Sequence, residues 1–205
     1  TDGLKHWCGR GGTGAVMGSK NLRAIVVQGT NRVPVYNSEK MNEFAKWFSN
    51  VHRENDGIVF KSKYGTIGGL ESMDAQGLLP TYNFTKGSLE NAESIGPIKC
   101  KRVVGYKGDD IEIEEKYGGP EYESAGSLAS NCGITSQKHS CKANELCAKY
   151  GLDSISTGVT ISFAMECFKR GLITKEDTGG LELSFSDGDV LLETIRMIAY
   201  REGIG

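Results

Sequence analysis

Residues 118–158 read GGPEYESAGSLASNCGITSQKHSCKANELCAKYGLDSISTG and contain the clearest helical pattern in this 205-residue chain. Ser136 is a suitable N-cap for a helix whose apolar side chains recur at helical spacing. Gly151 marks the end of that helix, because glycine readily adopts the left-handed conformation that closes many helices. A second helix of the same kind follows and ends at Gly171. This stretch therefore predicts a fold of packed helices.

Helical patterns continue on both sides of this stretch. Ser38 is a good N-cap, and apolar residues recur at helical spacing over residues 39–54, which predicts an amphipathic helix. Residues 174–177 (TKED) resemble a capping box that opens a short turn. Ser186 and Asp189 form another capping box, and we expect it to open the last helix.

The β signal is small. Residues 22–27 (LRAIVV) are β-branched and apolar, which predicts a strand. Residues 101–117 alternate around a Gly-Asp-Asp turn at 108–110, as in a small hairpin. Residues 1–20 are rich in glycine and are expected to be mostly loop, and residues 31–37 read as a connector between domains. The fold class is therefore mainly α with a small β portion (α+β).

Composition excludes several classes of protein. The 24 basic and 26 acidic residues give a net charge of -2, so we expect no nucleic-acid or membrane-surface footprint. No apolar run approaches the roughly 20 residues that span a bilayer. No signal peptide is visible, and the start of the chain reads as a processed end or as part of a longer protein.

The cysteines and histidines show no clear metal pattern. The six cysteines contain no C-x-x-C pair, so we expect reduced thiols in a cytoplasmic protein rather than a disulfide framework. His6, His52 and His139 lack the clustered spacing of zinc ligands, and surface or helix-end positions suit them better. The same argument weighs against a metal site built from the cysteines of residues 132–147.

The glycine-rich stretch near the start formally fits a dinucleotide-binding fingerprint at Gly9, Gly11 and Gly14. That fingerprint needs a strand before it and a helix after it, whereas here the predicted strand follows, so a nucleotide-binding oxidoreductase is the weaker reading. Successive backbone N–H groups, with Arg10 and Lys20 nearby, are nevertheless able to hold phosphate.

Several separate motifs, in order, resemble the aldehyde:ferredoxin oxidoreductases, which hold tungsten or molybdenum between two pterins. The resemblance covers nearly all of the chain but only the middle third of such an enzyme. It implies that residues 1–32 end a β-rich pterin-binding first domain and that residues 33–205 form an α-rich second domain. The matching motifs are 9–27 (GRGGTGAVMGSKNLRAIVV), 119–123 (GPEYE), 130–133 (SNCG), 143–147 (ANELC), 150–158 (YGLDSISTG), 164–167 (AMEC), 171–177 (GLITKED) and 199–205 (AYREGIG).

The resemblance implies two sets of cofactor-binding residues. In the glycine-rich loop, a backbone carbonyl helps to hold the Mg²⁺ that bridges the two pterin phosphates, and Ala15 is the candidate. The family's Asp-x-x-Gly-Leu-Asp motif ends here at Asp153, whose carboxylate is expected to accept hydrogen bonds from pterin N–H groups. Ala148 replaces the first Asp of that motif. The full set of candidates is Arg10, Gly12, Gly14, Ala15, Lys20, Gly151, Leu152 and Asp153.

The catalytic carboxylate of the family corresponds to Glu121 or Glu123, and Glu123 is the favoured candidate. A desolvated carboxylate with a raised pKa is able to relay a proton as an aldehyde hydrate is oxidised. The alternative is that both glutamates are solvated loop residues.

The iron–sulfur site departs from the family pattern. The family holds a [4Fe–4S] cluster with C-x-x-C-x-x-x-C and a distant fourth cysteine. Cys100 corresponds to the third ligand, but Gly96 and Glu93 occupy the other two positions. One thiolate cannot hold the cluster, so its presence is in doubt.

The resemblance implies an oxidoreductase that converts an aldehyde to a carboxylic acid with ferredoxin as electron acceptor. Its partners would be ferredoxin, a small aldehyde and, in one arrangement, a second copy of the chain. We expect the isolated chain to be inactive, because it lacks the family's other pterin motif. The alternative is a non-catalytic or degenerate family member that binds a pterin or a partner subunit.

Overall fold

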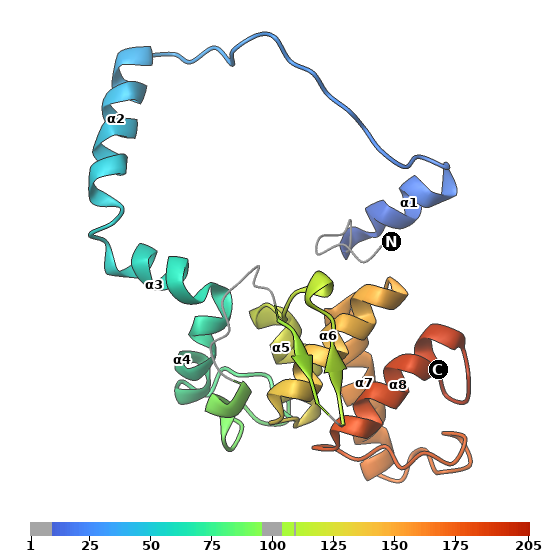
Figure 1. Cartoon of the computed structure of the whole chain (residues 1–205). Helices are drawn as coiled ribbons and strands as arrows, with labels where there is room; N and C mark the ends of the chain where they lie inside the picture. Colours follow the sequence, from blue (N-terminus) through green and yellow to red (C-terminus); the bar gives the residue numbers. More distant parts are fainter. Residues whose placement is uncertain (1–9, 96–103, 109) are drawn as a thin grey trace. The chain divides into compact units, whose positions relative to one another are not determined.

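The computed structural model describes residues 10–95, 104–108 and 110–205. The described chain is mainly helical with one two-stranded sheet, which confirms the predicted fold class (Figure 1). It divides into two compact units, Tyr64–Gly205 and the described part of Cys8–Lys63. The domain boundary expected between residues 32 and 33 stays a prediction. Among the described residues, no helix is both long and apolar enough to span a membrane.

The unit that precedes Tyr64 consists of short helices and an extended connector. Its elements are η1 (Arg10–Gly12), α1 (Thr13–Ser19), α2 (Ser38–Val51) and α3 (Asp56–Tyr64). α2 confirms the predicted amphipathic helix, but its cap is Asn37 rather than Ser38. The Asn37 side chain accepts a hydrogen bond from the backbone N–H of Lys40 at 2.9 Å, so the helix begins one residue earlier than expected.

Two expectations for this unit were wrong. The described part of the glycine-rich stretch, residues 10–20, is mostly helical rather than loop, because Gly12 adopts a left-handed conformation and α1 follows it over residues 13–19. The prediction of loop over residues 1–9 lies outside the described residues. Residues 22–27 do not form a strand, and Val26 and Val27 are 91% and 83% exposed. A strand needs a hydrogen-bonded neighbour, and among the described residues no strand pairs with this segment.

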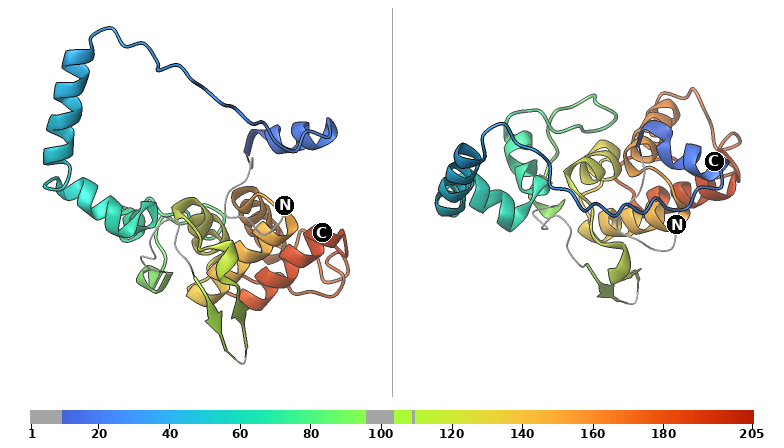
Figure 2. Two further views of the ribbon diagram at one scale, coloured as in Figure 1. Left: turned by 45° about the horizontal axis from the view of Figure 1, so that its top comes forward. Right: turned by 90° about the horizontal axis from the view of Figure 1, so that it is seen from above.

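The second unit is a bundle of helices with a small hairpin beside it (Figures 1 and 2). α5 packs on α7 and α6 packs on α8, while the hairpin contacts α6. The buried core between the helices includes Leu128, Ile161, Met165, Leu191 and Ile195. The elements are η2 (Thr66–Gly69), α4 (Leu70–Ala75), η3 (Ala92–Ile95), β1 (Tyr106–Lys107), β2 (Glu112–Ile113), η4 (Glu115–Tyr117), α5 (Tyr122–Leu128), η5 (Ser130–Cys132), α6 (Gln137–Tyr150), α7 (Ser154–Lys169) and α8 (Gly188–Tyr200).

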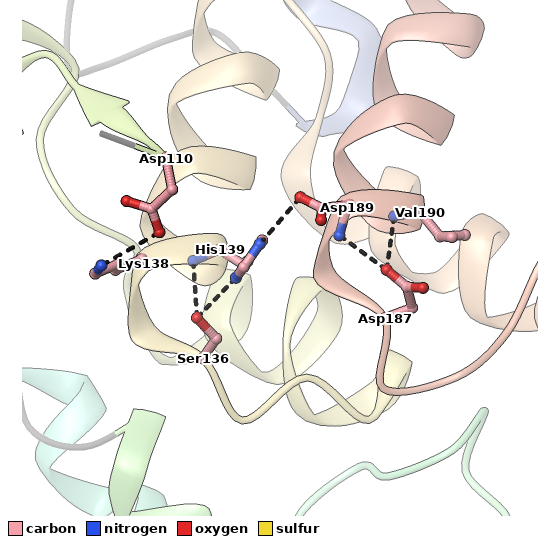
Figure 3. A network of polar contacts seen from close by, with 7 residues as sticks. All are labelled: Asp110, Ser136, Lys138, His139, Asp187, Asp189 and Val190. Atoms are coloured by element: carbon pink, nitrogen blue, oxygen red, sulfur yellow. Dashed lines mark hydrogen bonds and ion pairs between the residues drawn. The ribbon is translucent and has the colours of Figure 1, made fainter. Parts of the chain in front are cut away.

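Most of the predicted helix ends are confirmed. The Ser136 hydroxyl caps α6, and Gly151 closes that helix in the left-handed conformation at φ 72°. Gly171 likewise follows α7 with φ 70°. The last helix begins where expected, but Asp187 caps it instead of the predicted Ser186, because the Asp187 carboxylate accepts two backbone N–H groups of the first turn (Figure 3).

His139 ties the start of α6 to the start of α8 (Figure 3). Its Nδ1 lies 2.7 Å from the Ser136 hydroxyl, and its Nε2 lies 3.4 Å from a carboxylate oxygen of Asp189. Gly188 is required beside this ring, since a Cβ there would lie 2.3 Å from the imidazole. His139 therefore lies near the end of a helix, the kind of position that the sequence analysis expected for it, and its ring contacts residues at the starts of both helices.

An ion pair on α6 with a fully buried carboxylate binds the backbone of the hairpin. Glu145 is fully buried, and its carboxylate accepts hydrogen bonds from Lys142 Nζ at 2.6 Å and from the backbone N–H of Glu114 at 2.8 Å. Lys142 Nζ also donates to the backbone carbonyl of Glu112 in β2 at 2.7 Å. The two strands pair antiparallel, which confirms the predicted hairpin.

Asn131 in η5 holds an unusual turn in place. Residues 82–84 are all in the left-handed region, with φ of 49°, 51° and 60°. The backbone carbonyl of Asn131 accepts from the N–H of Asn83 at 3.0 Å, and its side-chain oxygen accepts from the N–H of Phe84 at 2.9 Å. Its amide nitrogen donates to the Ser162 hydroxyl at 2.7 Å. Consecutive non-glycine residues in this conformation are strained, so these bonds stabilise the turn.

Replacing Asn131 by leucine is expected to lower the free energy of unfolding by about 2–4 kcal/mol, because the N–H of Phe84 and the Ser162 hydroxyl lose their side-chain partner and the strained turn keeps only the backbone bond to Asn83. Chemical denaturation of the purified protein measures the change. Thr85→Val is the control from the same turn, since the exposed Thr85 hydroxyl bonds only locally, to the carbonyl of Tyr82 at 2.6 Å. Equal effects of the two substitutions would contradict the role given to Asn131.

Candidate functional site

The predicted catalytic glutamates stand at the start of α5. Gly118 turns the chain with φ 70°, and the buried Pro120 leads into the helix. Glu121 is the residue before the helix and Glu123 lies in its first turn, where the helix dipole favours negative charge. Both glutamates are exposed, so the described residues do not supply the desolvated environment expected for Glu123.

The predicted pterin-binding residues stand at the start of α7. Gly151 closes α6, and the N–H of Leu152 donates to the carbonyl of Cys147 at 2.8 Å, which completes the closing turn. Asp153 then caps α7, because its carboxylate accepts the N–H of Ser156 at 2.8 Å. These residues thus shape the short turn between two helices in addition to any role toward a ligand.

These two starts lie together in the fold. The hydroxyl of Ser124, next to Glu123, is 2.7 Å from the hydroxyl of Ser154, next to Asp153. Further along the two helices, a Cβ on Gly158 would lie 2.5 Å from the carbonyl group of Ser127. Only a glycine at residue 158 therefore allows α5 and α7 to approach this closely. The structure brings together two motifs that the sequence presents 30 residues apart.

Two buried thiols lie beneath this site. Burial raises the pKa of Cys132 to about 12. Burial also raises the pKa of Cys147 to about 12, with a smaller contribution from the negative charge of Asp153. In the part of the chain that the structure describes, no three His, Cys, Asp or Glu side chains are grouped closely enough to hold a metal ion. Cys132 and Cys147 are thus buried in the hydrophobic core of this unit.

The raised pKa values predict that Cys132 and Cys147 resist alkylation in the folded protein at pH 8. At a pKa of about 12 the reactive thiolate is scarce, so both should react at least about tenfold more slowly than the partly exposed Cys167. Iodoacetamide labelling followed by peptide mass spectrometry gives the three rates. In urea the rates should become similar, and fast labelling of Cys132 before unfolding would contradict its burial.

The glycine-rich candidates lie in the other unit, so their position relative to α5 and α7 is not described. Gly12 is in the left-handed conformation just before α1, and Lys20 follows the end of that helix. Gly14 and Ala15 lie within α1, where backbone carbonyls normally accept hydrogen bonds from the helix itself. Arg10 opens η1 and is exposed. Their role toward a pterin or Mg²⁺ stays a prediction.

The iron–sulfur candidates are mostly outside the described residues. Cys100 and Gly96 both lie there, and Glu93 belongs to the short helix η3. Ala148, at the position of the family's first motif Asp, is buried on α6. Sequence reasoning missed the structural importance of Glu145, although its spacing from Cys141 and Ala148 places it on the buried face of α6.

Comparison with known proteins gives consistent matches. Residues 43–205 match the family described as "Aldehyde ferredoxin oxidoreductase, domains 2 & 3". The tungsten-containing aldehyde ferredoxin oxidoreductase of Pyrococcus abyssi is 40% identical over 226 residues, which cover 96% of this chain and 35% of the relative. The enzyme of that name from Thermococcus kodakarensis is 37% identical over 218 residues, with the same coverage.

A more distant relative carries a different name. The "Aliphatic sulfonate oxidoreductase, WOR-like subunit" of Pyrococcus furiosus is 30% identical over 227 residues, which cover 98% of this chain and 35% of the relative. The chain thus spans about a third of the length of the curated relatives that it matches. The alignment with the Pyrococcus abyssi protein is longer than the chain itself, so that relative has residues without a counterpart here.

Proposed function

The chain belongs to the aldehyde ferredoxin oxidoreductase family, and from this premise we propose that it is part of a tungsten-dependent enzyme that oxidises an aldehyde to a carboxylic acid. The observation that carries the proposal is the meeting of the α5 start, with Glu123, and the α7 start, with Asp153, through a 2.7 Å hydroxyl contact. Each start is a motif that resembles the family, and the fold places them side by side.

The residues present fit a pterin at the start of α7. The Asp153 carboxylate is partly exposed, and a carboxylate is the acceptor that the amino and ring N–H groups of a pterin require. Gly151 and Leu152 would form the turn beside it. Arg10, Gly12, Gly14, Ala15 and Lys20 are proposed to hold the pterin phosphates and Mg²⁺. When bound, a tungsten bis-pterin supplies the two-electron oxidation, with tungsten favoured over molybdenum by the names of the relatives.

The chain's own part in the reaction is proton transfer. Oxidation of an aldehyde with water to a carboxylic acid releases two electrons and two protons. We assign Glu123 to accept one of these protons from the aldehyde hydrate, because its carboxylate is exposed in the first turn of α5, next to the contact with the α7 start, and a positioned carboxylate is able to act as a general base. Glu121, directly before the helix, is the second candidate.

The residues present do not fit a [4Fe–4S] cluster. Cys100 stands alone in the motif, since Gly96 and Glu93 replace the other two cysteines, and four thiolates are normally needed. No step of the proposed reaction therefore uses the cluster. Ferredoxin as the electron acceptor, a cytoplasmic location and a homodimer are further parts of the proposal that rest on the family alone.

Replacing Glu123 by glutamine is expected to lower kcat at least about 100-fold, because the amide cannot accept the proton. Glu121→Gln is the matched control, since it alters a neighbouring exposed carboxylate in the same way. Both variants should keep their tungsten, measured by elemental analysis, and the protein should come from the complete gene. A large loss with Glu121→Gln and none with Glu123→Gln would reverse the assignment.

The decisive experiment is elemental analysis, intact mass and aldehyde oxidation of the complete gene product, purified without oxygen. Stoichiometric tungsten with aldehyde turnover supports the proposal, and the iron content of the same sample tests the cluster. We expect the 205-residue chain alone to show no turnover. The second candidate is a non-catalytic family member, which the buried Ala148 in the pterin motif favours. Absence of tungsten, molybdenum and activity would select it.

A further inference from the structure

We propose that the Ser124–Ser154 hydroxyl pair is a clasp that positions the two halves of the site relative to each other. The inference rests on the proposed function, because it assigns the pair a role toward Glu123 and Asp153. Both serines are positioning residues in this view, since neither is asked to touch the substrate.

The position of the pair in the fold is the first argument. Ser124 directly follows Glu123 in the first turn of α5, and Ser154 directly follows Asp153 as the first residue of α7. Their hydroxyl oxygens lie 2.7 Å apart, an ordinary O–H···O distance, and both side chains are partly buried. A bond between these two residues therefore fixes the backbone that carries each neighbouring carboxylate.

The packing of the same two helices is the second argument. Gly158 sets how closely α5 and α7 approach, but this contact lies about one helical turn beyond Ser154. Gly158 thus allows close packing of the two helices, and the Ser124–Ser154 contact fixes the helix starts that carry Glu123 and Asp153. The hydroxyl of Ser127, on the same face of α5, instead bonds the carbonyl of Glu123 in its own helix at 2.7 Å.

Removing the hydroxyl contact is expected to lower the turnover rate rather than to weaken substrate binding. Small misplacement of reacting groups reduces catalysis strongly, because proximity and orientation account for much of the barrier reduction. Removing either hydroxyl should therefore lower kcat about tenfold with little change in KM. Since each single substitution already breaks the bond, the double variant should lose no more than either single variant.

The experiment uses the complete gene product with its cofactor. The variants are Ser124→Ala, Ser154→Ala, the double variant, Ser154→Thr, Ser154→Val and the control Ser127→Ala. Threonine keeps the hydroxyl and valine replaces it with a methyl group of similar shape, so this pair tests the bond even where alanine impairs folding. The measurements are kcat, KM, tungsten content and the rate at which pterin is released on warming, followed by the fluorescence of the released pterin.

The outcomes distinguish failure of the positioning role proposed for the Ser124–Ser154 pair from failure of the proposed function. The clasp is supported when Ser154→Thr stays within about threefold of the parent while Ser154→Val loses about tenfold in kcat and releases pterin faster. It is overturned when the parent oxidises aldehyde but Ser154→Val behaves like Ser127→Ala, or when the two alanine effects simply add. A parent protein without aldehyde oxidation overturns the proposed function, and in that case equal pterin release from Ser154→Thr and Ser154→Val overturns the clasp as well.

Discussion

Replacing Glu145 by alanine is expected to lower the free energy of unfolding by about 3–5 kcal/mol, the usual cost of removing one partner from a buried ion pair. The substitution leaves the ammonium of Lys142 without its partner at 2.6 Å and leaves the backbone N–H of Glu114 without its acceptor. Thermal or urea unfolding of the purified protein measures the loss.

The control for this prediction is Lys149, which also lies on α6 and also contacts Glu114. Lys149 Nζ lies 3.6 Å from the Glu114 carboxylate, and both side chains are substantially exposed. Exposed ion pairs contribute little because water screens them, so Lys149→Ala should cost less than about 1 kcal/mol. A second control is the double variant Lys142→Met, Glu145→Leu, which should be less harmful than Glu145→Ala because no unpaired charge remains.

A cost below about 1 kcal/mol for Glu145→Ala would show that the hairpin is held by something other than this ion pair. The Lys142 side chain is 22% exposed, so solvation of its ammonium is one such compensation. Hydrogen exchange at the hairpin amides would then identify the remaining support, because loss of the anchor should speed exchange there.

The helices were predictable because their signals are local. Ser136 and Gly151 lie at the two ends of α6, and each acts on backbone groups within a few residues of itself. The hairpin was predictable for the same reason, since its turn separates two short alternating segments. Even the errors at helix starts were shifts of one residue, from Ser38 to Asn37 for example, where two neighbouring residues are both good caps.

The strand expected at residues 22–27 was not predictable from local signals. Its β-branched composition fits a strand, but a strand also requires a neighbour in the sheet, and that is a non-local property. For the glycine-rich stretch, the prediction instead missed an element that is present. Its helix α1 contains Gly14 and Gly18, which have low helix propensity, so composition alone favoured loop.

The motifs of the candidate site were predictable from the sequence, but the contact between them was not. The motifs with Glu123 and Asp153 were identified from the sequence, but nothing in the sequence states that Ser124 and Ser154 meet. The same holds for Glu145, whose acidic side chain would ordinarily be assigned to the surface. Pairing across the fold depends on how helices cross, and residue spacing within one helix carries no information about that crossing.

The crossing itself yields the second large prediction. Replacing Gly158 by alanine is expected to lower the free energy of unfolding by about 3 kcal/mol, although alanine is a better helix former by about 1 kcal/mol. The new Cβ would lie 2.5 Å from the carbonyl carbon and oxygen of Ser127 and 2.8 Å from the nitrogen of Leu128. These are backbone atoms, so no side-chain rotation relieves the clash and one helix must move.

Gly126→Ala provides the matched comparison for Gly158→Ala. Gly126 is also a buried helical glycine, in α5, but a Cβ there meets no atom within 4 Å among those described. It should be neutral or should stabilise the protein by up to about 1 kcal/mol, because only the helix-propensity gain remains. Thermal unfolding distinguishes the two, with a lower midpoint for Gly158→Ala alone. If both substitutions stabilise the protein equally, α5 and α7 do not cross as closely as Gly158 implies, and the Ser124–Ser154 contact would then need another explanation.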